Sequence, residues 1–152
     1  MQNKNVNETE KLFQRFRNVL REALHTGKVT LPNDIEINYS PMLLYRAVRI
    51  SDNKKTIDDS DFMSQMEKGQ HGADDSVIEN YSCSFFTCIA PLKDAMKLPR
   101  KNKKIAKGYV KKVHGARKAL SHFEHVHLFR YKDVEIANEF EVISDEEMDT
   151  SK

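Results

Sequence analysis

Cysteine, glycine and proline are scarce in this sequence of 152 residues, and long apolar runs are missing. The two cysteines, Cys83 and Cys88, are too few for a disulfide scaffold, so we expect free thiols in a cytoplasmic protein. Five glycines and four prolines exclude a glycine-rich phosphate loop and a repetitive linker. No apolar run approaches the roughly 20 residues of a membrane helix, and the first residues lack the apolar core of a signal peptide. We therefore expect no membrane partner and no secretory route.

The remaining composition is that of one folded unit. Hydrophobic residues make up 39% of the chain and charged residues 32%, and the length suits one domain with a continuous core. An amphipathic helix followed mainly by strands predicts an α+β fold, in which the helix packs on a mostly antiparallel sheet with short helices. We expect one domain over residues 1–143 and a disordered acidic tail over residues 144–152.

The leading helix has the clearest pattern. Apolar residues recur at helical spacing between Leu12 and Leu24, and Gly27 follows where a C-terminal cap belongs, so we expect one helix over residues 8–25. Strands are expected at Lys28–Leu31, Ile35–Tyr39, Leu43–Ile50, within Val77–Ile89, and at Ile105–Val113, His125–Tyr131 and Glu139–Ile143. Short helices are expected near Phe62–Met66, after Pro91 and at Ala116–Phe123.

Charge is distributed unevenly along the chain, although the net charge is only +2. Residues 93–118 contain eleven Lys and Arg and one acid, whereas residues 133–152 contain eight acids and one base. A basic segment of this kind can bind nucleic acid or another anionic partner, and Tyr109 within it could stack on a base. The candidate anion-binding residues are Lys101, Lys103, Lys104, Lys111 and Lys112. The basic segment could equally face the acidic tail of its own chain, and the sequence leaves both alternatives open.

Three histidines form the pattern His-x-x-His-x-His at His122, His125 and His127. Alternation along a strand places His125 and His127 on one face, where neutral imidazoles could bind zinc or iron. Apart from Glu135, no further group of ligands accompanies them. Histidines paired with local carboxylates are the simpler interpretation, and we expect no metal.

Another pattern spans most of the chain. Arg46 lies on an early predicted strand, Ser84 in a Ser-x-Ser on a middle strand, and Glu139 and Glu141 in a Glu-x-Glu on the last strand. Over residues 43–143 this order resembles the Arg, Ser and Glu-x-Glu pattern of mono-ADP-ribosyltransferases. The resemblance implies a compact α+β domain, NAD as cofactor, and transfer of ADP-ribose to a protein or nucleic-acid acceptor.

The resemblance also implies a role for each of these residues. Cleavage of the nicotinamide–ribose bond develops positive charge on the sugar, which the carboxylate of Glu141 would stabilise. Glu139 would orient the acceptor group, Arg46 would pair with the pyrophosphate, and Ser84 would support the nicotinamide side. Two alternatives remain for the cofactor contacts, namely Arg49 in place of Arg46 and Ser82 in place of Ser84.

A binding module is the alternative function, from a different class of protein. Such a module would hold nucleic acid or another anionic partner through residues 93–118 without performing chemistry on it. Glu139 and Glu141 would then form the solvent-facing side of an edge strand, with Phe140 and Val142 turned inward.

Overall fold

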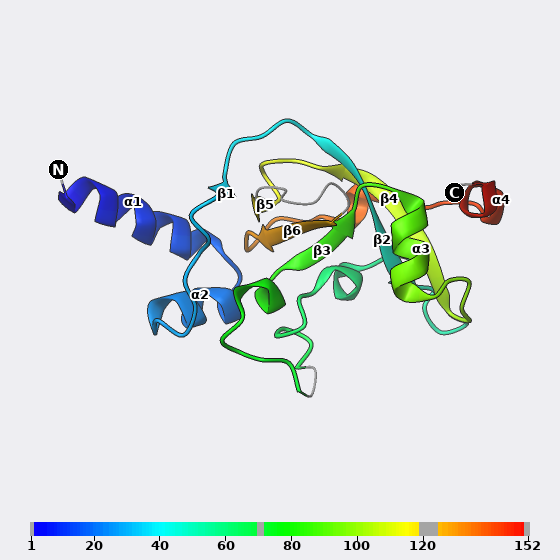
Figure 1. Cartoon of the computed structure of the whole chain (residues 1–152), viewed down its shortest axis with the longest axis horizontal. Helices are drawn as coiled ribbons and strands as arrows, with labels where there is room; N and C mark the ends of the chain where they lie inside the picture. Colours follow the sequence, from blue (N-terminus) through cyan, green and yellow to red (C-terminus); the bar gives the residue numbers. More distant parts are fainter. Residues whose placement is uncertain (1, 70–71, 119–124, 151–152) are drawn as a thin grey trace.

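The computed structural model describes residues 2–69, 72–118 and 125–150, and it has the predicted α+β fold (Figure 1). Its helices are α1 (Gln2–Arg15), α2 (Asn18–His25), α3 (Ile89–Met96) and α4 (Asp145–Thr150), with short 3₁₀ helices η1 (Asp59–Phe62), η2 (Ile78–Tyr81) and η3 (Ala137–Glu139). The strands are β1 (Ile35–Glu36), β2 (Met42–Arg49), β3 (Cys83–Phe86), β4 (Lys103–Val110), β5 (Gly115–Lys118), β6 (His125–Arg130) and β7 (Phe140–Val142). None of the helices within the described ranges is long and apolar enough to cross a membrane.

The seven strands form one antiparallel sheet in the order β1-β5-β6-β3-β2-β4-β7. Strand β2 pairs with β4 along its whole length, from Met42 opposite Val110 to Arg49 opposite Lys103. Its pairing with β3 on the other side is limited, among the described residues, to Tyr45 opposite Phe86. Strand β2 is therefore paired along its whole length with β4, but it diverges from β3 on its other side.

One face of the sheet carries the helices. At the β5–β6 end, Phe16 and Leu20 pack on Ala116 and Phe129. At the other end, α3 and α4 bury Leu92 and Met148 against Ile105, and α3 lies beside β2 and β3 (Figure 1). Alternation along the strands places Ser84, Phe86, His125 and His127 on this same face, between the two groups of helices.

The opposite face carries the main core. Its strands contribute Leu44, Val48, Phe85, Val126 and Leu128, and Phe62, Ile136 and Phe140 close over them. The rings of Phe62, Phe85 and Phe140 lie with centroids 5.0–6.2 Å apart, within the range at which aromatic pairs add to simple burial.

The helix expected over residues 8–25 is two helices, because the backbone between them pairs with the end of β6. Phe16 forms a bridge with Tyr131, Arg17 N donates to Arg130 O, and Lys132 N donates to Arg15 O. These tertiary hydrogen bonds replace the intrahelical bonds that would continue α1 into α2. After Gly27, the predicted strand at Lys28–Leu31 is a loop, and the next predicted strand is shortened to β1.

Part of the acidic segment 144–152, for which the sequence predicts disorder, is helical in the structure. Residues Asp145–Thr150 form α4, and Met148 on this helix is buried, with 5% of its surface exposed. This apolar side chain among the acids packs the helix against the core. Of the predicted helix at Ala116–Phe123, residues 116–118 belong to β5, and residues 119–123 lie outside the described part of the chain.

Candidate functional site

A cavity of about 310 Å³ lies between α3, the centre of the sheet, and the two segments 63–68 and 79–82. It lies where the helices leave the sheet uncovered and where β2 and β3 diverge. Its lining includes three cations (Arg46, Lys68, Lys103), three rings (Phe86, His125, His127), two serines (Ser82, Ser84) and two apolar side chains of α3 (Leu92, Met96). Cationic, aromatic and apolar groups thus meet around one space of small-molecule size.

Arg46 is fixed in the gap between β2 and β3. Its Nη1 donates to Ser84 O over 2.6 Å, and its Nε donates to Asp61 O over 2.5 Å. Its Nη2 donates to Met63 O over a longer 3.4 Å. The guanidinium takes the place of the backbone hydrogen bonds that paired strands would make here. All three acceptors are neutral carbonyls, so the positive charge of Arg46 is not cancelled by these contacts.

Lys68 and Lys103 add two further positive charges to the cavity. Within the described ranges, Arg46, Lys68 and Lys103 make no ion pair with a carboxylate. Partial desolvation lowers the pKa of Lys68, and the nearby charges of Arg46 and Lys103 lower it further, while Cys83 and Asp61 act in the opposite direction. Lys68 is therefore close enough to both other cations for their charges to act on it.

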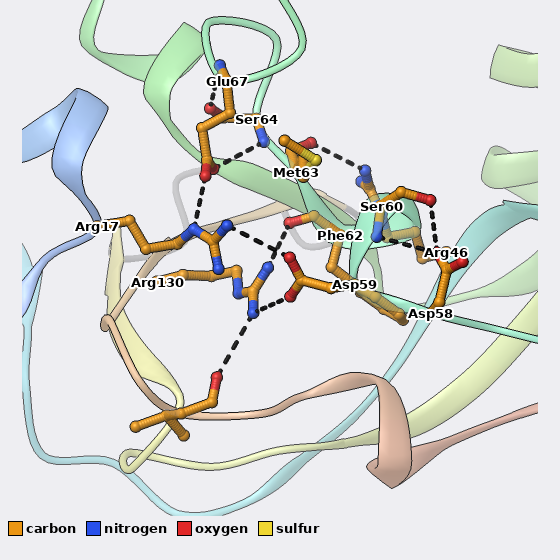
Figure 2. A network of polar contacts seen from close by, with 11 residues as sticks. Arg17, Arg46, Asp58, Asp59, Ser60, Phe62, Met63, Ser64, Glu67 and Arg130 are labelled. Carbon is orange, nitrogen blue, oxygen red and sulfur yellow. Dashed lines mark hydrogen bonds and ion pairs between the residues drawn. The ribbon is translucent and has the colours of Figure 1, made fainter.

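The segment that carries Lys68 is held in place by a network of charged side chains (Figure 2). Arg17 Nε contacts Glu67 over 2.5 Å, and Glu67 also accepts from Ser64 N. Asp59 lies between Arg17 and the buried Arg130, at 3.3 and 2.7 Å. Hydrogen bonds to charged groups are among the stronger ones in proteins, so this network fixes the wall of the cavity to α2 and β6.

Ser82 fixes the tautomer of the His127 ring. The Ser82 hydroxyl lies 2.7 Å from Glu79 O and 2.8 Å from His127 Nδ1. A hydroxyl has one proton, and a carbonyl can only accept, so the hydroxyl donates to Glu79 O and accepts from Nδ1–H. Burial and the neighbouring imidazole of His125 lower the pKa of His127 to about 4. At neutral pH the ring is therefore uncharged, and its Nε2 carries a free lone pair.

The other two rings lie against each other beside His127. Phe86 and His125 stack with their centroids 4.8 Å apart and their planes 12° from parallel, and the centroid of His127 is 4.6 Å from that of His125. Partial burial lowers the pKa of His125 as well. The ring side of the cavity is thus neutral at physiological pH, in contrast to the cationic side.

The structure brings some of the predicted cofactor-binding and catalytic residues together and leaves others apart. Arg46 and Ser84 line the same cavity. Glu141 lies on β7, exposed and opposite Lys107, about three strand spacings, or roughly 14 Å, from Phe86 across the sheet. The side chains of Lys107 and Tyr45 stand between Glu141 and the cavity.

Glu139 does not share a strand face with Glu141. It belongs to η3, before β7 begins, so the alternation assumed for the Glu-x-Glu does not apply. Its carboxylate pairs with Lys111 over 3.3 Å and lies 4.0 Å from His114 Nε2. The acidic residue that does line the cavity is Glu79, which pairs with Lys118 over 2.9 Å.

Most of the predicted anion-binding lysines contact other parts of the chain. Lys104 pairs with Asp145 over 3.1 Å, Lys111 pairs with Glu139, and Lys112 Nζ lies 3.4 Å from Asn38 Oδ1. Lys107, which lies between them on β4, pairs with Glu147. Lys101 is exposed outside the cavity, and Lys103 is the one member of the predicted set that lines it. Acids of the C-terminal region thus pair with three lysines of the basic segment, Lys104, Lys107 and Lys111.

In the described part of the chain, no group of three or more His, Cys, Asp or Glu side chains could hold a metal ion. His125 and His127 lie side by side as predicted, whereas His122 lies outside the described residues. Cys83 is buried in the core, and burial raises the pKa of its thiol. Cys88 is exposed just before α3.

Several residues of the cavity were not predicted from the sequence. Lys68, Leu92 and Met96 carry no local signal, because they enter the site through the fold of a loop or a helix, and Phe86 enters it from β3. The pairing of Ser82 with His127 had a partial signal, since Ser-x-Ser and His-x-His each place two polar side chains on one strand face. Their meeting depends on the register of β3 against β6, which sequence spacing does not determine.

Comparison of the chain with models of protein families, with curated proteins and with solved structures finds no match. Within the molecule itself, the features that bear on function are the three uncompensated cations, the neutral ring cluster and the volume that joins them.

Proposed function

We propose that this protein binds a small phosphorylated molecule in the cavity, with its phosphate held by Arg46, Lys68 and Lys103. The observation that carries the proposal is the absence of a carboxylate partner for these three cations among the described residues. Other lysines nearby, such as Lys104 and Lys107, are paired with acids. A cluster of cations without counter-charges is stabilised by an anion, and phosphate offers oxygens to several cations at once.

The dimensions of the cavity favour a compact ligand. Its volume of about 310 Å³ lies at the lower end of the range for small-molecule sites, about 300–1,000 Å³. A molecule with one ring system and one phosphate fits this volume better than a dinucleotide does. The apolar side chains of α3 and the three rings provide a second contact region beside the phosphate.

The proposal is tested by isothermal titration calorimetry with ribose 5-phosphate and ribose. We expect ribose 5-phosphate to bind and ribose not to bind. In Lys68→Gln and Lys103→Gln the affinity should fall by about tenfold or more, since a hydrogen bond to a charged group contributes roughly 1.5–3 kcal/mol.

Lys104→Gln is the matched control, because Lys104 is adjacent in sequence but pairs with Asp145 outside the cavity. Its affinity for ribose 5-phosphate should change by less than about twofold. Equal binding of ribose and ribose 5-phosphate, or an equal loss in Lys103→Gln and Lys104→Gln, would refute the proposal.

ADP-ribosyl transfer from NAD remains a second candidate. The shared cavity of Arg46 and Ser84 supports it, and a protein or nucleic-acid acceptor held by residues 93–118 remains part of that hypothesis. The position of Glu141, on β7 outside the cavity, does not support it. Incubation with labelled NAD separates the candidates: transfer or NAD cleavage that is lost in Glu141→Gln would favour the transferase.

A further inference from the structure

Among the polar groups that line the cavity, His127 carries a ring nitrogen whose hydrogen-bonding role is fixed by its neighbours. His127 lines the cavity, and its Nδ1 is turned toward Ser82, which is buried with 5% of its surface exposed. Nε2 therefore remains available to a ligand, and among the described residues it has no hydrogen-bond partner. Because Nδ1 carries the proton, Nε2 can only accept.

His127 Nε2 and the cations lie on different sides of the cavity. Lys103 comes from β4 and His127 from β6, with β2 and β3 between them, so their backbones are separated by at least three strand spacings, or roughly 14 Å. A single ligand that contacts both must carry an anionic group at one end and a hydrogen-bond donor at the other.

The surface between the cations and His127 contains aromatic and apolar side chains. It is formed by the stacked rings of Phe86 and His125 and by Leu92 and Met96 of α3. Planar rings with polar edges bind well to surfaces of this kind, since the faces contact apolar groups while the edge makes directed hydrogen bonds.

From this arrangement we infer that the ligand is a nucleoside monophosphate whose base donates a hydrogen bond to His127 Nε2. The inference rests on the proposed function, because the phosphate contacts are those already assigned to Arg46, Lys68 and Lys103. Ser82 is a positioning residue in this scheme, since it fixes which nitrogen of His127 carries the proton.

The test compares adenosine 5′-monophosphate with purine riboside 5′-monophosphate, which differs by lacking the amino group of the base. Calorimetry at pH 7.5 should show about tenfold tighter binding of the adenosine compound, because a buried acceptor left without a donor costs roughly 1–3 kcal/mol. Ribose 5-phosphate measures the phosphate contacts alone and should bind more weakly than adenosine 5′-monophosphate.

His127→Phe removes the acceptor but keeps a flat ring. The two purine nucleotides should then bind equally, while the affinity for ribose 5-phosphate stays unchanged and shows that the cavity is folded. His25→Phe is the matched control, since it makes the same change on α2, outside the cavity, and it should retain the tenfold preference. In Ser82→Ala the preference should fall, and ¹⁵N chemical shifts of His127 should lose the signature of the Nδ1–H form.

The possible failures can be told apart. Equal binding of the two purine nucleotides to the unaltered protein, or no gain over ribose 5-phosphate, overturns the inference and leaves phosphate binding in place. Absence of binding by all three phosphorylated compounds overturns the proposed function and the inference with it.

Discussion

At the scale of single residues, His127 connects the stability of the fold to pH. Its pKa in the folded protein is about 4, against an ordinary value of 6.5, chiefly because it is buried. Between these two values the unfolded chain binds a proton that the folded chain does not. The free energy of unfolding should therefore fall as the pH falls through this window.

The corresponding prediction concerns His127→Gln. Between pH 6.5 and pH 4 the unaltered protein should lose on the order of 1–3 kcal/mol from this one group, a figure reduced from the full shift because the ring is partly accessible. The variant should lack this contribution, so its unfolding free energy should change less over the same range. Urea unfolding at a series of pH values measures the difference, and parallel curves for the two proteins would contradict it.

Residue identities alone could suggest some of this site. The sequence pointed to Arg46 and Ser84, and both line the cavity. It pointed equally to Glu139 and Glu141, which lie elsewhere. The difference has a physical cause, since short motifs report which side chains share a strand but not which strands become neighbours.

At the scale of secondary structure elements, α4 shows how an acidic segment can dock on a folded domain. Three kinds of contact hold it: ion pairs from Lys104 and Lys107 to Asp145 and Glu147, a hydrogen bond from Lys93 Nζ to Met148 O over 3.0 Å, and burial of Met148 among Leu92, Ile105 and other apolar residues. The ion pairs are largely accessible to solvent. We therefore expect the apolar contact to contribute most of the stability.

This expectation is tested by comparing Met148→Ala with Asp145→Asn. The first change removes a buried side chain and should lower the free energy of unfolding by about 2–3 kcal/mol. The second removes an exposed ion pair and should cost less than about 1 kcal/mol, with the cost declining as salt is added. Urea unfolding at low and high salt measures both, and a larger effect for Asp145→Asn would show that charge holds the helix.

The elements themselves were largely predictable. The predicted strands at Leu43–Ile50 and His125–Tyr131 agree with β2 and β6 to within one or two residues, because alternation of apolar side chains is a local signal. The break between α1 and α2 was not predictable, since it depends on hydrogen bonds from residues 15–17 to the distant end of β6. The same applies to α4, whose apolar partners come from α3 and β4.

At the scale of the whole molecule, the fold brings part of the basic segment 93–118 into contact with acids of residues 133–152. The acidic C-terminal region lies along β4, where ion pairs join Lys104, Lys107 and Lys111 to Asp145, Glu147 and Glu139. Of the two alternatives that the sequence left open, contact with the chain's own acids accounts for these lysines. The cavity keeps its positive charge because these acids pair with Lys104, Lys107 and Lys111, none of which lines it.

A nucleic-acid partner for the basic segment can be tested through this pairing. A triple variant, Glu139→Gln, Asp145→Asn and Glu147→Gln, frees three lysines while keeping Met148. If the segment binds single strands, the variant should bind an oligonucleotide more tightly, and the slope of log affinity against log salt should steepen by about 2. Fluorescence anisotropy at several salt concentrations measures the slope, and unchanged binding would rule out these lysines as a nucleic-acid surface.

The divergence of β2 from β3 has a further consequence. Elsewhere the sheet is joined by rows of backbone hydrogen bonds, but at this seam a single guanidinium carries much of the connection. The pairing of β2 with β3 is therefore the weakest in the sheet, and it also borders the cavity. An anion that binds Arg46 occupies the cavity and stabilises this pairing. A bound ligand would connect the two parts of the sheet on either side of the gap between β2 and β3. Occupancy of the cavity should therefore slow amide hydrogen exchange in β3.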